Sequence, residues 1–149
     1  MYDPIQIATS KFDQGFSCSQ SLFSAFALQF GVSDEIASRI ASPFGGGIAR
    51  QGETCGAVTG ALMALSLKFG PRMGESNDGI YHISQEFLHR FQQQNTYLQC
   101  RQLINFDLSQ PGDLEEARRY QVFDKVCPIL VRSAAEIVLS MLASDEQPI

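Results

Sequence analysis

The amino-acid sequence predicts an all-α fold, a compact single-domain helical bundle of about six to seven helices. Apolar residues recur at helical spacing along most of the chain, and short glycine or proline signals separate the segments. No alternating strand pattern of useful length occurs. The 149 residues have the usual size of one domain, and a chain of that length buries roughly 70% of the surface it exposes when unfolded. We therefore expect residues 1–149 to form one domain.

Three helices are expected in the N-terminal part of the chain. Each opens on a residue that can cap a helix or occupy its first turn, and each is followed by glycine or proline. The signals that bound these helices are Asp3–Pro4 and Gly15, Cys18 and Gly31, and Ser33 and Pro43.

The stretch from Pro43 to Gly70 is the expected centre of the bundle. It begins with a glycine-rich loop and continues into a helix over Cys55–Phe69, for which Thr54 supplies a cap. Apolar residues occupy nearly the whole circumference of this helix, which is typical of a helix buried on most sides. We expect it to be the most buried helix of the fold.

The remaining helices are expected after an exposed loop that follows Gly70. One covers about residues 79–94, a short one capped by Thr96 holds Cys100, and one begins in the charged run DLEEARR. The last helix starts at Cys127, which is expected as its N-cap because Pro128 suits the first turn.

Cys55 is the first residue that indicates chemistry. A cysteine in the first turn of a helix lies among unpaired backbone N–H groups and at the positive end of the helix dipole, and both favour the thiolate. Such thiols have pKa values of roughly 3.5–7.5, so we expect Cys55 to be the most acidic thiol of the chain. The alternative is a small buried apolar residue, as free cysteines often are.

The chain holds four cysteines, Cys18, Cys55, Cys100 and Cys127, in recognisable surroundings. The segments are FSCSQSLFSAF, FGGGIARQGETCGAVTGAL, CRQLI and CPILVRSAAEIV. In this order, and with the motif CGAVTG, they resemble the C_GCAxxG_C_C family of redox-active proteins over almost the whole chain. The resemblance implies an all-helical domain whose four cysteines do redox work.

A shared cysteine site is the expectation that joins these observations. Cys18, Cys55 and Cys127 fall at or near expected helix N-termini. The four cysteines are too far apart in the sequence to meet locally, so only the tertiary fold could gather them. The alternative is that they occupy unrelated core positions.

Two chemistries could use such a site. In the first, a thiolate, with Cys55 preferred, attacks a disulfide or another electrophile, and a second cysteine among Cys18, Cys100 and Cys127 resolves the adduct. In the second, the same four thiolates hold an iron–sulfur cluster or, less readily, a zinc ion. The paired C-x-x-C spacing common in metal sites is absent.

A third hypothesis is a small-anion site in the glycine-rich loop. Gly45, Gly46 and Gly47 offer backbone amides ahead of a helix, and Arg50 adds a positive charge. Gly56 leaves the surface beside Cys55 bare, so a ligand could approach closely. The loop lacks the Gly-Lys-Ser/Thr of a P-loop, which argues against a nucleotide.

Charge and hydropathy restrict the expected partners. The net charge is −5 and no Lys/Arg cluster occurs, so neither nucleic acid nor an anionic membrane is expected as partner. No stretch reaches 18 uninterrupted apolar residues, and the N-terminus lacks a signal-peptide pattern, so a cytoplasmic location is expected. Expected partners are a redox partner protein or a small-molecule thiol or electrophile, and a homodimer is left open.

Overall fold

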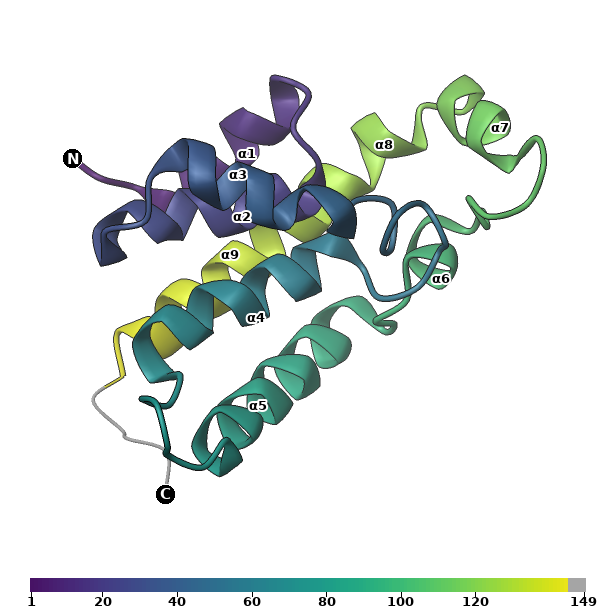
Figure 1. The fold of residues 1–149 in the computed structure, drawn as a ribbon. Helices are drawn as coiled ribbons and strands as arrows, with labels where there is room; N and C mark the ends of the chain where they lie inside the picture. The colour runs from purple at the N-terminus through teal and green to yellow at the C-terminus, as the bar shows by residue number, and fades with distance from the viewer. Residues whose placement is uncertain (145–149) are drawn as a thin grey trace.

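The computed structural model describes residues 1–144 and confirms the all-α fold (Figure 1). Between the helices of this part of the chain, the strand-like pairing is a single antiparallel bridge, Thr54 with Gln99. None of the helices found there has both the length and the hydrophobicity that a membrane span requires. The helices are α1 (Pro4–Asp13), α2 (Cys18–Ala27), α3 (Asp34–Ala41), α4 (Gly56–Phe69), α5 (Asp78–Asn95), α6 (Cys100–Ile104), α7 (Asp113–Arg119), α8 (Val122–Lys125) and α9 (Cys127–Leu142), with short 3-10 turns at Leu28–Phe30 and Ser42–Phe44.

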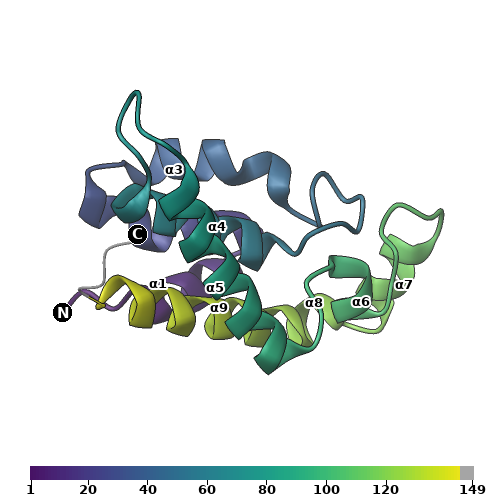
Figure 2. The ribbon, with the colours of Figure 1, turned by 90° about the horizontal axis from the view of Figure 1, so that it is seen from below.

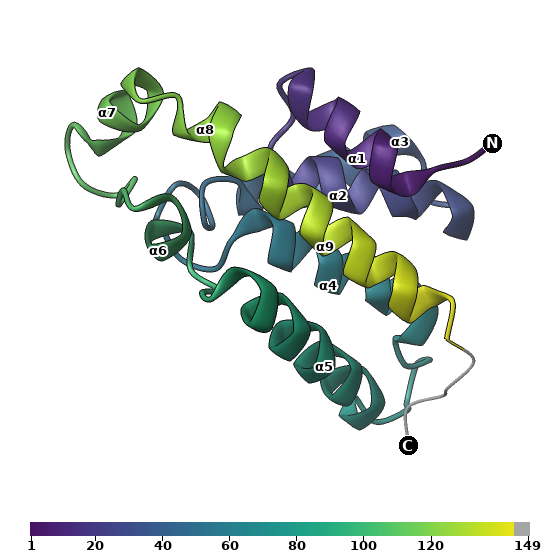
Figure 3. The same cartoon turned by 180° about the vertical axis from the view of Figure 1, so that it is seen from behind.

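Helix α4 lies in the middle of the arrangement. It packs against α2, α5 and α9, and α9 in turn packs against α1 (Figure 3). The short helices α6, α7 and α8 lie at one end of the molecule, and the glycine-rich loop lies at that same end (Figure 2). The part of the sequence with the least regular structure is therefore gathered beside the N-terminal ends of α4 and α9.

The caps expected from the sequence are present at α1 and α3 and absent at three later helices. Asp3 and Ser33 accept hydrogen bonds from first-turn amides of α1 and α3, as expected. Thr54 is not the cap of α4, because it pairs with Gln99, and Cys55 takes the N-cap position. Thr96 is not the cap of α6 either, because it ends α5 with φ at 76°. Cys127 is not the N-cap of α9, because Val126 takes that position and Cys127 is the first helical residue.

Helix α2 is more completely buried than helix α4. Eight of the ten residues of α2 are buried, against eight of the fourteen residues of α4, so the expectation for Cys55–Phe69 was wrong. The difference comes from serines, which a hydropathy pattern counts as surface residues. Ser19 donates to the Ala41 carbonyl at 2.9 Å and Ser24 to the Gln20 carbonyl at 2.6 Å. A buried hydroxyl that keeps its hydrogen bond costs little free energy.

Two glycines allow α2 and α4 to approach each other closely. A Cβ atom added at Gly60 would lie 2.9 Å from the backbone oxygen of Ser19, and one added at Gly56 would lie 3.0 Å from the backbone nitrogen of Ser19. Both distances are shorter than ordinary contacts, so a side chain at either position would force the helices apart. The contact fixes the start of α2 against the start of α4.

The buried apolar residues form two clusters. The larger one draws on α1 to α5 and on most of α9. The smaller one lies under the short helices and contains Cys100, Ile104, Leu108, Ala117, Val122 and Cys127. Cys55 belongs to the larger cluster, and Cys18 packs against both. The cysteines therefore lie at the junction of the two clusters.

Leu65 and Leu62, both on α4, provide a matched test of this core. Leu65 is completely buried and Leu62 only partly so. We expect Leu65→Ala to lower the free energy of unfolding by about 2–5 kcal/mol, because it leaves a cavity in the core, and Leu62→Ala to lower it less. Urea denaturation of both variants measures the difference. Equal losses would contradict the described orientation of α4.

Candidate functional site

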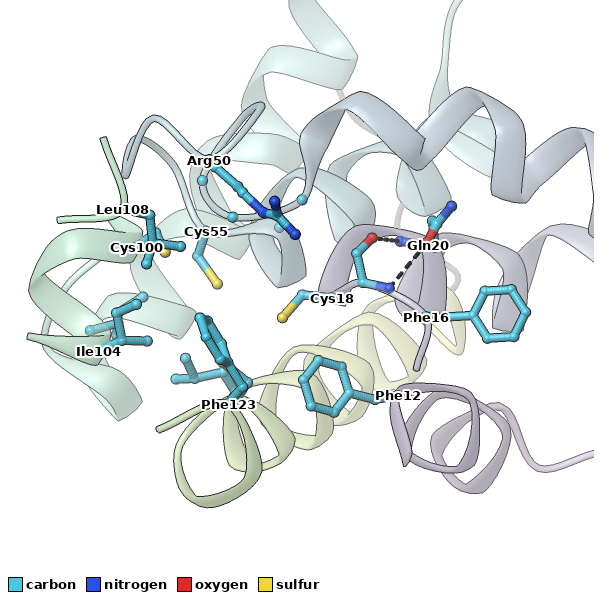
Figure 4. Close-up of a pocket in the computed structure, with 18 of the residues that line it drawn as sticks. Phe12, Phe16, Cys18, Gln20, Arg50, Cys55, Cys100, Ile104, Leu108 and Phe123 are labelled. Carbon is cyan, nitrogen blue, oxygen red and sulfur yellow. Dashed lines mark hydrogen bonds between the residues drawn. The ribbon is translucent and has the colours of Figure 1, made fainter. Parts of the chain in front are cut away.

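The structure brings the four cysteines to one cavity of about 810 Å³. Each stands at the N-terminal end of a helix: Cys18, Cys100 and Cys127 are the first residues of α2, α6 and α9, and Cys55 is the N-cap of α4. All four are free thiols. Figure 4 shows the sulfurs of Cys18 and Cys55 directed into the space beside Phe123. The helix-end position of Cys100 adds a fourth member to the three expected from the sequence.

Cys55 and Cys100 are held by the bridge between Thr54 and Gln99. The Cys55 amide donates to the Leu98 carbonyl at 2.9 Å, and the Cys100 amide donates to the Glu53 carbonyl at 2.6 Å. These two hydrogen bonds join segments that lie more than forty residues apart in the sequence. A one-residue bridge leaves no alternating pattern in a sequence, so this pairing could not be expected from it.

Cys18 is held by a capping box at the start of α2. The Ser17 amide donates to the side-chain oxygen of Gln20 at 3.1 Å, and the Gln20 amide donates to the Ser17 hydroxyl at 3.3 Å (Figure 4). A Cβ atom at Gly56 would lie 3.1 Å from the Cβ atom of Cys18. The glycine that follows Cys55 is therefore what lets Cys18 lie beside it.

The glycine-rich loop contains five consecutive residues with the positive φ values of left-handed backbone. These residues, Gly46 to Arg50, have φ values between 50° and 69°. Three of them are not glycine, and this conformation costs such residues roughly 1–2 kcal/mol each. Gly47 also contacts Cys100 so closely that an added Cβ atom would lie 2.6 Å from the Cys100 Cβ atom. Backbone strain of this kind gathers at functional sites, and here it lies against the cysteines.

Burial is the main cause of the raised pKa values of two thiols, Cys55 and Cys100. It raises the pKa of Cys55 to about 11 and the pKa of Cys100 to about 12. The amides of Ala57 and Val58 donate to the Cys55 sulfur and lower its pKa, but by less than burial raises it. The expectation that Cys55 is the most acidic thiol is therefore wrong, because the helix terminus acts on a sulfur that has been removed from water.

Cys127 is the acidic thiol, and Cys18 is its partner. Hydrogen bonding of Cys18 to the ionised sulfur of Cys127 lowers the pKa of Cys127, although burial and the nearby Asp124 carboxylate oppose it. The same interaction, reinforced by burial, raises the pKa of Cys18 well above its ordinary value. The pair is thus most stable with a thiolate at Cys127 and a protonated thiol at Cys18.

The arrangement of the thiols does not form a metal-binding group. Four thiols on one cavity have the donor chemistry that zinc or an iron–sulfur cluster requires. Among residues 1–144, however, no three His, Cys, Asp or Glu side chains are close enough together to hold a metal ion. In this arrangement the cysteines do not form a ligand group for a single metal ion.

Removal of the Cys18 thiol tests its influence on Cys127. We expect Cys18→Ala to raise the pKa of Cys127, so that alkylation of Cys127 reaches half its maximal rate at a higher pH than in the unmodified protein. Alkylation rates at Cys127, measured against pH by mass spectrometry, report the change. Cys100→Ala is the control and should leave this midpoint in place, because Cys100 does not shift the pKa of Cys127. An unchanged midpoint in Cys18→Ala would refute the pairing.

Comparison with known proteins agrees with the cysteine pattern. The model of one protein family, described as "Putative redox-active protein (C_GCAxxG_C_C)", matches residues 16–141 and so includes all four cysteines. No curated protein and no solved structure matches the chain. Since the family model covers most of the sequence, the chain belongs to the C_GCAxxG_C_C family.

Proposed function

We propose that the protein is a dithiol oxidoreductase in which Cys127 is the attacking thiolate and Cys18 the resolving thiol. The observation that carries the proposal is the placement of Cys18 and Cys127 on the wall of one cavity, close enough for each thiol to change the pKa of the other. The interaction between the two sulfurs lowers the pKa of Cys127 and keeps Cys18 protonated. Thiol–disulfide exchange requires one thiol in each of these states. The family's redox description agrees with this assignment.

The reaction balances without a metal. The Cys127 thiolate attacks one sulfur of a substrate disulfide, forming a mixed disulfide and releasing the other half as a thiolate. Cys18 then loses its proton to the released thiolate, and its sulfur attacks Cys127. This step forms a Cys18–Cys127 disulfide and frees the second half of the substrate as a thiolate, which takes a proton from solvent. The protein loses two electrons, the substrate gains two, and an external dithiol reverses the cycle.

Cys55 and Cys100 have a different role in this scheme. Their raised pKa values keep both thiols protonated at neutral pH, so they do not compete with Cys127 as nucleophiles. We assign them to the apolar wall of the cavity, where they fill space beside the reacting pair.

Disulfide mapping tests the proposed pair. Reduced protein treated with hydroxyethyl disulfide in the absence of oxygen is expected to lose two of its four thiols and to yield a Cys18–Cys127 disulfide by peptide mass spectrometry. Cys18→Ser should stop the reaction at a mixed disulfide on Cys127, because the resolving thiol is gone. Cys100→Ser is the control and should still form the Cys18–Cys127 bond.

Other outcomes would overturn the assignment. A disulfide that maps to Cys55 and Cys100, or a full thiol count after oxidation, would remove the proposed pair. Iron and acid-labile sulfide in anaerobically purified protein, with visible absorbance that is lost when the cysteines are replaced, would favour a cluster instead.

A further inference from the structure

We infer that the cavity selects small disulfides that carry a carboxylate, and that Arg50 with the glycine-rich loop binds this carboxylate. The inference rests on the proposed dithiol function and names the substrate class of the same site. It follows from three features of the cavity: its enclosed thiols, an unpaired arginine on its wall, and backbone amides without acceptors.

The enclosure of the thiols favours a small substrate over a protein disulfide. Cys127, the proposed nucleophile, has only 5% of its surface exposed. The cavity of about 810 Å³ lies within the range of roughly 300–1,000 Å³ typical of small-molecule sites. Its wall also holds the rings of Phe12 and Phe123, which suit the methylene groups of a small disulfide.

Arg50 is a cation on the cavity wall without an anionic partner. In the described chain Arg90, Arg101 and Arg119 pair with carboxylates, and Arg50 is one of the arginines that do not. Its side chain reaches from the glycine-rich loop over the part of the cavity that holds Cys18 and Cys55 (Figure 4).

The amides of Gly46 and Gly47 are the second part of the carboxylate site. Each amide from Ile48 to Glu53 donates to a backbone carbonyl, because these residues complete the left-handed turn. Gly46 and Gly47, at its start, have no hydrogen-bond acceptor among the described residues, and both line the cavity. Unpaired successive amides next to a guanidinium form the donor set that carboxylates prefer.

The acidic residues of the cavity restrict where an anion can lie. Asp13 and Asp124 also line it, and Arg118 contributes a second cation. Asp124 lies close enough to Cys127 to raise the pKa of that thiol, so negative charge is disfavoured near α8. The carboxylate therefore belongs at the loop side, with the disulfide extending from Arg50 toward Cys127.

Three small disulfides of different charge test the selection: dithiodipropionate, hydroxyethyl disulfide and cystamine, which are anionic, neutral and cationic. With reduced protein at low salt, dithiodipropionate should oxidise the Cys18–Cys127 pair fastest, after each rate is divided by the rate with a free model thiol. Arg50→Gln should slow the reaction with dithiodipropionate by about tenfold or more, the effect of one lost charged hydrogen bond, and leave the rate with hydroxyethyl disulfide unchanged. Arg132→Gln, an exposed arginine outside the cavity, is the control and should change neither rate.

Suberate separates failure of this inference from failure of the dithiol function. It resembles dithiodipropionate with methylenes in place of the sulfurs, so it can bind but cannot oxidise. It should slow alkylation of Cys127 by iodoacetamide in the unmodified protein and not in Arg50→Gln. Oxidation by all three disulfides at equal relative rates, without protection by suberate, would overturn the carboxylate site and leave the dithiol function standing. Protection by suberate without oxidation by any disulfide would overturn the dithiol function and leave the carboxylate site standing.

Discussion

The close contact between α2 and α4 is the constraint on which the site depends. Gly56 and Gly60 remove the side chains that would keep the helices apart, and the backbone of Ser19 lies against them. Because the two helices meet at their N-terminal ends, Cys18 and Cys55 open into the same cavity. The bridge at Thr54 adds Cys100, and the start of α9 adds Cys127.

Competition between burial and local fields decides which thiol reacts. Raising the pKa of Cys55 from 9.0 to about 11 disfavours its thiolate by about 3 kcal/mol. A helix N-terminus typically stabilises a negative charge by only about 0.3–1 kcal/mol, so it cannot reverse the effect of burial on the Cys55 thiolate. The pKa of Cys127 is lowered instead, because the neighbouring thiol of Cys18 donates a hydrogen bond to its ionised sulfur. A second thiol, rather than a helix dipole, supplies the activation.

The sequence predicted the helices well because their signals are local. Asp3 and Ser33 stand where the structure has caps, and α1 has the bounds that Pro4 and Gly15 indicate. The sequence also led us to expect that the cysteines come together, because a shared site requires it, but it did not predict how they are arranged. What was missed depends on tertiary contacts: the bridge of Thr54 with Gln99, the left-handed turn through Ile48 and the pairing of Cys18 with Cys127. None of these leaves a periodic or compositional trace in the chain.

The most direct measurement of the central claim is the reduction potential of the cysteine site. Protein equilibrated with a series of reduced and oxidised dithiothreitol mixtures can be assayed for the Cys18–Cys127 disulfide in its peptides. The double variant Cys55→Ser and Cys100→Ser is predicted to keep a two-electron transition at the potential of the unmodified protein, since neither sulfur takes part. Loss of that transition in the double variant, or its survival in Cys127→Ser, would contradict the account.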